Sequence, residues 1–254
     1  MSKINSNILH RYKIIVQYDG SSFSGWQLQK NKKTVQGDIE NALGIISGSK
    51  DRIAVHGAGR TDSGVHAYGQ VAHFDLDTNL TSVDLSNAIN SNTSKDCRIM
   101  SIEKVDSDFE SRFDATKRRY RYQVYLGSSL LYRNQAWLIN DIEIKILEEI
   151  SQMIIGEHDF LSFSKYRPAQ KNTNSIIYES VWKKKDKMLF YEILGNRFLH
   201  HMVRYLVGTM VQVSRGLYPK EKFSSLLHQP KKNVQIHRAP ASGLILLKVE
   251  YDKY

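Results

Sequence analysis

The residues best suited to chemistry lie in a glycine-rich stretch of the first half of the chain, from His56 to Gly69. Its four glycines would let the backbone and a ligand approach each other closely. Within the stretch, Asp62 follows Arg60 by two residues. An ionised aspartate can attack carbon covalently, and a neighbouring arginine favours the ionised carboxylate. The stretch therefore predicts a nucleophile at Asp62, although Asp-Ser-Gly is also a common turn and Arg-x-Asp a common surface ion pair.

Common nucleotide and metal sites are not indicated. The patterns Gly-x-x-x-x-Gly-Lys-Ser/Thr and Gly-x-Gly-x-x-Gly are both missing from the stretch. The adjacent His200 and His201 have no third ligand at helical spacing, which favours solvent-facing or RNA-facing histidines over a zinc site. The single cysteine, Cys97, cannot form an internal disulfide and is expected to be a buried apolar residue. We therefore expect no metal and no small-molecule cofactor.

Positive charge is concentrated in the second half of the chain. The sequence has 36 Lys and Arg against 26 Asp and Glu, a net charge of +10. Residues 1–111 hold 12 basic and 13 acidic side chains, whereas residues 112–254 hold 24 and 13, a net charge of +11. This division favours a surface in the second half that binds the phosphates of a polyanion.

Hydrophobic periodicity predicts the same order of elements twice. In the first half we expect strands at 12–18, 53–56, 70–76 and 97–105, a helix at 35–46, and a second helix with Ser82 as its N-cap. In the second half we expect strands at 119–126, 176–183, 188–194 and 244–251, and helices at 141–155 and 199–213. Each half has the order β-α-β-β-α-β. This order predicts an α+β protein of two ferredoxin-like halves, residues 1–111 and 112–254, joined into one extended, mainly antiparallel sheet.

A membrane location is not indicated. No run approaches the roughly 18 apolar residues that a membrane helix needs, and the opening residues lack the apolar stretch of a signal peptide. We therefore expect a cytoplasmic protein with no membrane partner.

Five segments, spread over nearly the whole chain, resemble in order the motifs of the tRNA pseudouridine synthase A family. The first four are Tyr18 to Gln27, Gly59 to Ala67, Arg118 to Tyr122 and Asn196 to Arg204, and the fifth is Ala239 to Leu244. Ser63 departs from the family pattern, which usually has alanine there, and changes only a small side chain beside the nucleophile. The resemblance implies the pseudouridine synthase fold and a cofactor-free isomerase that detaches uracil from its ribose in tRNA, turns the base and rejoins it through C5.

The resemblance also implies roles for particular residues. Asp62 is the nucleophile, Tyr120 lies against the target base and handles the proton leaving C5, and Arg60 helps to extrude the nucleotide and fill its place. Arg204 pairs with the aspartate, and His66 and His200 are further candidates for binding substrate. The implied partner is the anticodon stem-loop of tRNA, at uridines 38, 39 and 40, held by a homodimer.

The attack route stays open at this point. The carboxylate could attack C6 of uracil or C1′ of the ribose, or the route could pass through a glycal, and all three need an ionised Asp62. Because the target atoms are hidden in a stacked helix, the base must be flipped out at a cost of a few kcal/mol.

Two other functions fit parts of the sequence. A non-catalytic RNA-binding protein would need only paired ferredoxin-like sheets with basic faces, but not the loop from Arg60 to Asp62. A metal-dependent phosphoesterase would use the acidic and histidine side chains Asp19, Asp62, Asp75, His66 and His73. Trp26, Trp137 and Trp182 are assigned to packing, although the loop from Tyr18 to Trp26 is also suited to positioning RNA.

Overall fold

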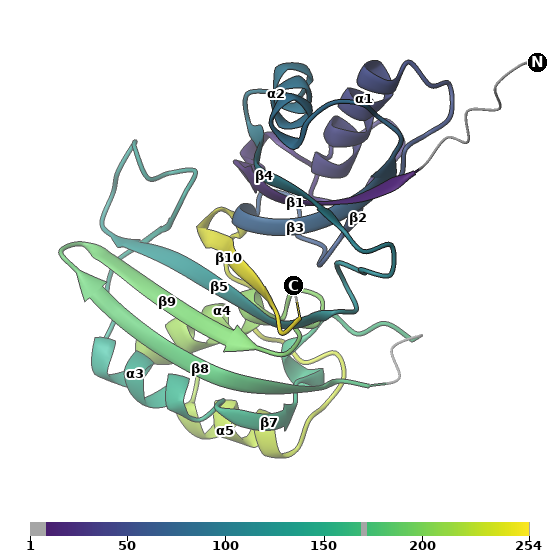
Figure 1. Cartoon of the computed structure of the whole chain (residues 1–254). Helices are drawn as coiled ribbons and strands as arrows, with labels where there is room; N and C mark the ends of the chain where they lie inside the picture. The colour runs from purple at the N-terminus through teal and green to yellow at the C-terminus, as the bar shows by residue number, and fades with distance from the viewer. Residues whose placement is uncertain (1–8, 169–171, 254) are drawn as a thin grey trace, which may run out of the picture. The chain divides into compact units, whose positions relative to one another are not determined.

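The computed structural model describes residues 9–168 and 172–253 and places them in two compact units (Figure 1). The first unit holds residues 9–115 together with 251–253, and the second holds residues 116–250. The strands are mostly antiparallel and are combined with helices in both units, which confirms the α+β class. Among the described residues, no helix combines the length and apolar character needed to cross a membrane.

The first unit contains a sheet in the order β4-β1-β3, with β2 paired to β3. The strands are β1 (His10–Tyr18), β2 (His56–Gly57), β3 (His66–Leu76) and β4 (Cys97–Val105). β1 is antiparallel to both neighbours, with Ile14 opposite Ala72 on one side and Ile102 on the other. Helices α1 (Val35–Ser47) and α2 (Ser82–Asn92) lie on one face of this sheet (Figure 1).

Both helices of the first unit begin at a threonine. The Thr34 side chain accepts a hydrogen bond from the Gly37 N–H, and α1 ends at Gly48 in the left-handed conformation. The N-cap of α2 is Thr81, whose side chain accepts from the Asp84 N–H, so the prediction of Ser82 was wrong by one residue. Two adjacent hydroxyl residues offer the same capping group, and the turn geometry decides between them.

The second unit contains a sheet in the order β10-β5-β9-β8-β7, with the short β6 parallel to β5. Its strands are β5 (Ala115–Leu126), β6 (Trp137–Ile139), β7 (Gly156–Asp159), β8 (Asn174–Lys185), β9 (Met188–Gly195) and β10 (Leu244–Tyr251). Helices α3 (Ile144–Gln152), α4 (Met202–Ser214) and α5 (Lys220–His228) lie on one face of this sheet (Figure 1). The short β6, β7 and α5 were not predicted.

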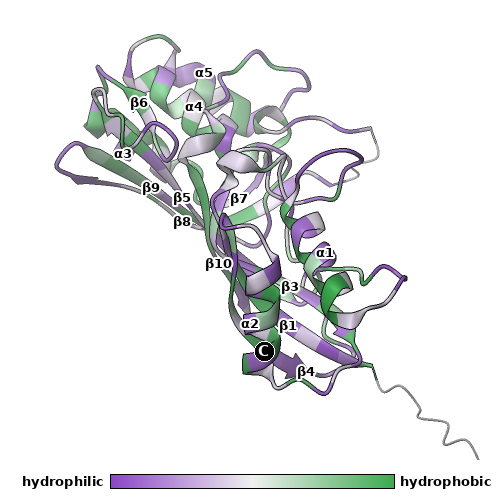
Figure 2. Cartoon of the chain, turned by 90° about the horizontal axis from the view of Figure 1, so that it is seen from above, coloured by the Kyte–Doolittle hydropathy of each residue, from purple (hydrophilic) through white to green (hydrophobic). Residues whose placement is uncertain are grey.

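Burial follows the predicted periodicity. In Figure 2, the strands of each unit carry both hydrophobic and hydrophilic residues. The apolar positions at helical spacing that predict α4 are buried, with Met202, Leu206 and Met210 at most 1% exposed. Cys97 is also buried, and burial raises the pKa of its thiol to about 12, so it is a packed apolar residue as expected. Trp26 and Trp182 are buried as predicted, whereas Trp137 is half-buried and stacks on His237.

Candidate active site

Asp62 lies in the loop that connects β2 to β3 in the first unit. Its side chain is half-buried, and its backbone carbonyl accepts from the Val65 N–H at 3.1 Å in a turn closed by Gly64 at φ 79°. Arg60 is exposed, and within the described part of the chain its side chain forms no ion pair or hydrogen bond. The loop therefore presents a guanidinium group to solvent beside a partly accessible carboxylate, and not the surface ion pair that the spacing also allowed.

The backbone on both sides of Asp62 is fixed by neighbouring segments. The Thr61 hydroxyl is within 2.8 Å of the buried Tyr18 hydroxyl, and the Thr61 carbonyl accepts from the Trp26 N–H at 3.1 Å. Ser63 Oγ donates to the Phe23 carbonyl at 3.2 Å. The segment from Tyr18 to Trp26 thus holds the loop on either side of the carboxylate, and positioning of RNA by this segment stays a prediction. Because this support is buried, it limits movement of Asp62 toward or away from a bound nucleotide.

The glycines of this region serve different purposes. A Cβ atom on Gly57 would lie 2.5 Å from the Trp26 indole, and one on Gly25, at φ 94°, would lie 2.7 Å from the Thr61 carbonyl. A Cβ atom on Gly59 would meet nothing within 4 Å. Gly57 and Gly25 are therefore required for close packing of the two segments, and Gly59 is the glycine that leaves open space beside Arg60.

His66 lies behind the loop. Its side chain is buried, and Nδ1 accepts from the Gly20 N–H at 3.1 Å, at the start of the short 3₁₀ helix η1 (Gly20–Ser22). Asp19 Oδ1 also approaches Nδ1, at 3.2 Å. Burial opposes ionisation of Asp19, but hydrogen bonds from Ser21 and the neighbouring His66 together outweigh it and hold the pKa of that carboxyl below its ordinary value. The structure thus gives His66 a supporting position, and direct contact with substrate stays a prediction.

Tyr120 lies on β5 in the second unit, opposite Ile193 of β9. Its ring is 9% exposed and meets Phe198 edge to face, with 5.2 Å between ring centres. Tyr120, Tyr122 and Val124 are all buried and share one face of the strand, as the alternation of side chains along a strand at 119–126 requires. Burial raises the pKa of Tyr122 far above its ordinary value, and its hydroxyl donates to the Pro240 carbonyl.

The opposite face of β5 carries paired charges. Arg119 forms two hydrogen bonds to Glu179, at 2.6 and 2.9 Å. Glu192 accepts from both Arg121 and Lys183. Burial opposes ionisation of Glu192, but these two cations lower its pKa. A phosphate group would have to compete with these carboxylates for Arg119 and Arg121.

The helix predicted at 199–213 would place His200 and Arg204, four positions apart, on one helix surface, and this prediction is wrong. α4 begins at Met202, and His201 has a left-handed φ of 63°, so His200 lies outside the helix. Arg204 is inside the helix but only 8% exposed, and its Nε donates to the Ala239 carbonyl at 2.9 Å. The two residues do not share an exposed helix surface, because the chain turns sharply just before α4.

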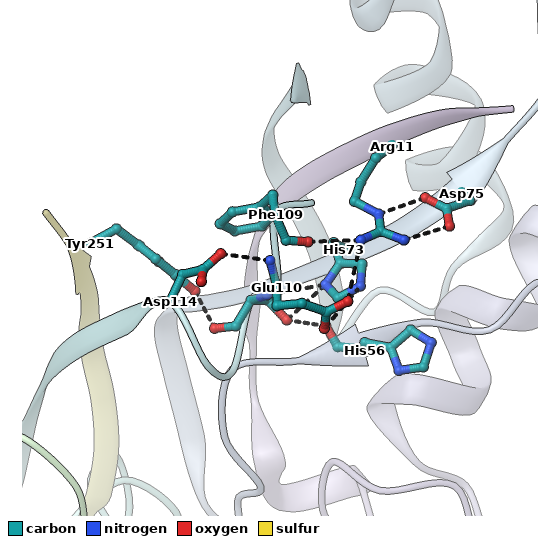
Figure 3. Close-up of polar contacts among 9 residues, drawn as sticks. Arg11, His56, His73, Asp75, Phe109, Glu110, Asp114 and Tyr251 are labelled. Carbon is teal, nitrogen blue, oxygen red and sulfur yellow. Dashed lines mark hydrogen bonds and ion pairs between the residues drawn. The ribbon is translucent and has the colours of Figure 1, made fainter. Parts of the chain in front are cut away.

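Two side chains of the phosphoesterase alternative, Asp75 and His73, are occupied by other partners. Figure 3 shows Asp75 paired with Arg11 through both carboxylate oxygens, each at 2.8 Å. His73 Nδ1 accepts from the Ser111 N–H. His66 and His73 stand seven residues apart on the extended β3, about 23 Å at 3.3 Å per residue. His66 and His73 therefore cannot bind one metal together.

Comparison with known proteins assigns the chain to a family. The family model described as tRNA pseudouridine synthase matches residues 14–114 and 150–252. The chain therefore belongs to the tRNA pseudouridine synthase family, whose members are isomerases.

Full-length relatives support the same assignment. A tRNA pseudouridine synthase A of Maridesulfovibrio salexigens is 39% identical over 96% of this chain and 91% of its own length. The tRNA pseudouridine synthase A of Anoxybacillus flavithermus is 35% identical over 96% of this chain and 100% of its own length. The tRNA pseudouridine synthase A of Borrelia turicatae is 38% identical over 93% of this chain and 97% of its own length. The resemblance seen in the five motifs is confirmed.

Proposed function

We propose that the protein converts uridine to pseudouridine in the anticodon stem-loop of tRNA, at positions 38, 39 and 40, with Asp62 as the nucleophile. The observation that carries the proposal is the Asp62 loop. It presents a half-buried carboxylate, and the residues on either side of it, Thr61 and Ser63, are hydrogen-bonded to Tyr18 and Phe23. A binding protein would not need this support. Family membership supports the reaction class.

The reaction is balanced without a co-reactant. The bond between N1 of uracil and C1′ of ribose breaks, the bond between C5 and C1′ forms, and the proton lost from C5 is offset by one gained at N1. The Asp62 carboxylate forms a transient covalent bond and is released unchanged. We assign to Tyr120 contact with the base and transfer of the C5 proton.

Base extrusion is assigned to Arg60. An exposed guanidinium group that has no hydrogen-bond or ion-pair partner among the described residues can enter the space that the flipped nucleotide leaves, which offsets part of the cost of a few kcal/mol. We further assign the catalytic loop to residues 1–111 and most phosphate contacts to the basic residues 112–254. Arg204 is proposed as the partner of Asp62, and the working form as a cytoplasmic homodimer.

The test compares two aspartates of the first unit. Purified Asp62→Asn is incubated with transcribed tRNA beside Asp77→Asn, which changes an exposed carboxylate outside the loop. We expect no pseudouridine from Asp62→Asn, by mapping of modified positions, at unchanged tRNA affinity and thermal stability. Asp77→Asn should react like the parent protein. Turnover by Asp62→Asn would refute the nucleophile, and tight binding with no product from the parent protein would indicate an RNA-binding protein instead.

A further inference from the structure

Four basic side chains gather at the N-terminal end of α4 in the second unit. We call them the α4 basic cluster: Arg167, His200, His201 and Arg238. The two imidazole rings lie 3.8 Å apart between centres. Arg167 Nη2 is 3.2 Å from His200 Nδ1, and Arg238 Nη1 is 2.9 Å from His201 Nδ1. Residues from three separate segments of the unit therefore meet at one helix end.

The chemistry of these contacts fixes the charge of the cluster. A guanidinium group can only donate, so each histidine Nδ1 accepts from its arginine. The imidazole rings therefore hold the arginines without balancing their positive charge. Among residues 9–168 and 172–253, neither Arg167 nor Arg238 forms an ion pair with a carboxylate. This distinguishes them from Arg119 and Arg121 of the same unit, whose charges are balanced by Glu179 and Glu192.

The backbone that carries Arg238 is anchored to α4. The Ala239 N–H donates to the Arg204 carbonyl at 3.0 Å, and Arg204 Nε donates back to the Ala239 carbonyl. On the other side, His237 stacks on Trp137 with 5.6 Å between ring centres. A Cβ atom on Gly208 would lie 2.3 Å from the His237 carbonyl oxygen, so the segment crosses the helix where it has no side chain. Arg238 is thus fixed between two anchored neighbours.

Arg167 is positioned by His200. The Lys165 N–H donates to the His200 carbonyl at 2.9 Å, which joins the segment before Arg167 to the turn that precedes α4. The left-handed conformation of His201 turns the chain there, so that consecutive histidines can each accept from a different arginine. The two guanidinium groups are therefore positioned before any ligand arrives, which lowers the entropy cost of binding.

Two guanidinium groups held by adjacent histidines repel a metal cation and attract an anion. Their planar donor forks match the oxygens of a phosphate group, and the partial positive charge at the start of α4 adds to the attraction. Taking RNA as the ligand from the proposed function, on which this step rests, we propose that the α4 basic cluster binds a backbone phosphodiester of the RNA substrate. Arg167 and Arg238 contact the phosphate, and His200 and His201 position them.

The test measures binding of the whole protein to a transcribed tRNA over a series of salt concentrations. The variants are Arg167→Gln, Arg238→Gln and their combination, with Lys145→Gln as the control. Lys145 is an exposed cation on α3 of the same unit and carries the same charge. Thermal unfolding of each variant confirms that the fold is retained.

We expect each arginine variant to lower affinity about tenfold at low salt, equal to about 1.4 kcal/mol. Each should also reduce the slope of log affinity against log salt by about 0.7 to 0.9, the value for one lost phosphate contact. Lys145→Gln should leave affinity within about twofold of the parent and the slope unchanged. Arginine variants that behave like Lys145→Gln would overturn the proposal.

A second measurement identifies the contact. Neutral methylphosphonate linkages are placed one at a time in a synthetic anticodon stem-loop. At one or two linkages, the neutral substitution should lower the affinity of the parent protein. The same substitution should not lower the affinity of Arg238→Gln any further, because the RNA change and the protein change remove the same contact. Losses that add at every linkage would refute a phosphate contact by Arg238.

The two proposals fail separately. If the protein makes no pseudouridine but the arginine variants show the lost affinity and lower slope, the proposed reaction fails and the phosphate site stands. If pseudouridine forms and the arginine variants bind like the control, the phosphate site fails alone.

Discussion

Asp62 in the first unit and Arg238 in the second are both fixed through the backbone beside them, but by different contacts. The Asp62 loop is held by buried, uncharged groups of the segment from Tyr18 to Trp26. Arg238 is held at the surface by a neutral histidine and by the crossing of its segment over Gly208. A reacting carboxylate needs a fixed distance, whereas a phosphate-binding arginine needs an uncompensated charge. The division of net charge between residues 1–111 and 112–254 fits these two requirements.

The largest expected effect comes from adding a side chain to Gly208 of α4, where residues 237–239 pack directly against the helix backbone. Gly208→Ala would place a Cβ atom 2.3 Å from backbone, which must shift, so we expect a loss of about 1 to 3 kcal/mol of unfolding free energy. Displacing residues 237–239 should also weaken tRNA binding. Gly44→Ala in α1 is the matched control, because its Cβ would meet nothing within 4 Å and should stabilise by about 0.5 to 1 kcal/mol. Urea unfolding and tRNA binding measure both variants. Unchanged binding by Gly208→Ala would show that this crossing does not place Arg238.

A smaller effect is expected behind the catalytic loop. Tyr18→Phe removes the hydrogen bond to Thr61 Oγ1, worth about 1 kcal/mol. If that energy holds Asp62 in its reactive position, kcat should fall about fivefold while the Kd for tRNA stays constant.

Tyr12→Phe is the control for this prediction, since Tyr12 lies on the same strand and its buried hydroxyl has no hydrogen-bond partner among the described residues. It should leave kcat unchanged. A fall in stability without a fall in kcat for Tyr18→Phe would assign Tyr18 to packing alone.

The smallest effect concerns acid stability of the first unit. Burial, together with the nearby Arg11 and His56 and despite the opposing charge of Glu110 and Asp75, lowers the pKa of His73. The unfolded chain therefore takes up a proton on this residue first, near pH 6.5. The stability that neutral His73 contributes is complete above that pH and is lost as the pH falls from there through the folded-state pKa.

His73→Asn keeps an acceptor for the Ser111 N–H but removes the titration. Its unfolding free energy, measured in urea between about pH 8 and 5, should fall less steeply than that of the parent. In the second unit, burial also lowers the pKa of His237, but its side chain is exposed, so His237→Asn should change the slope less. Equal slopes for the parent and His73→Asn would contradict the assignment.

Much of the fold could be predicted because its signals are local. The strand alternation of Tyr120, Tyr122 and Val124 and the apolar stripe of α4 depend only on the periods of a strand and a helix. The helix signals were less reliable at their ends, as Thr81 and the start of α4 at Met202 show. The i, i+4 interpretation of His200 and Arg204 failed because it assumed that the helix had already begun.

The sequence by itself determined the chemical groups: a carboxylate with a nearby arginine in a glycine-rich loop, a basic second half and five family motifs in order. Only the tertiary structure decided how these groups are held. Tyr18 contacts Thr61 at a sequence separation of 43 residues, and Arg238 contacts His201 at a separation of 37. The structure also decided that His66 and Arg204 are buried. No local period encodes such contacts, because they depend on which strands and helices pack together.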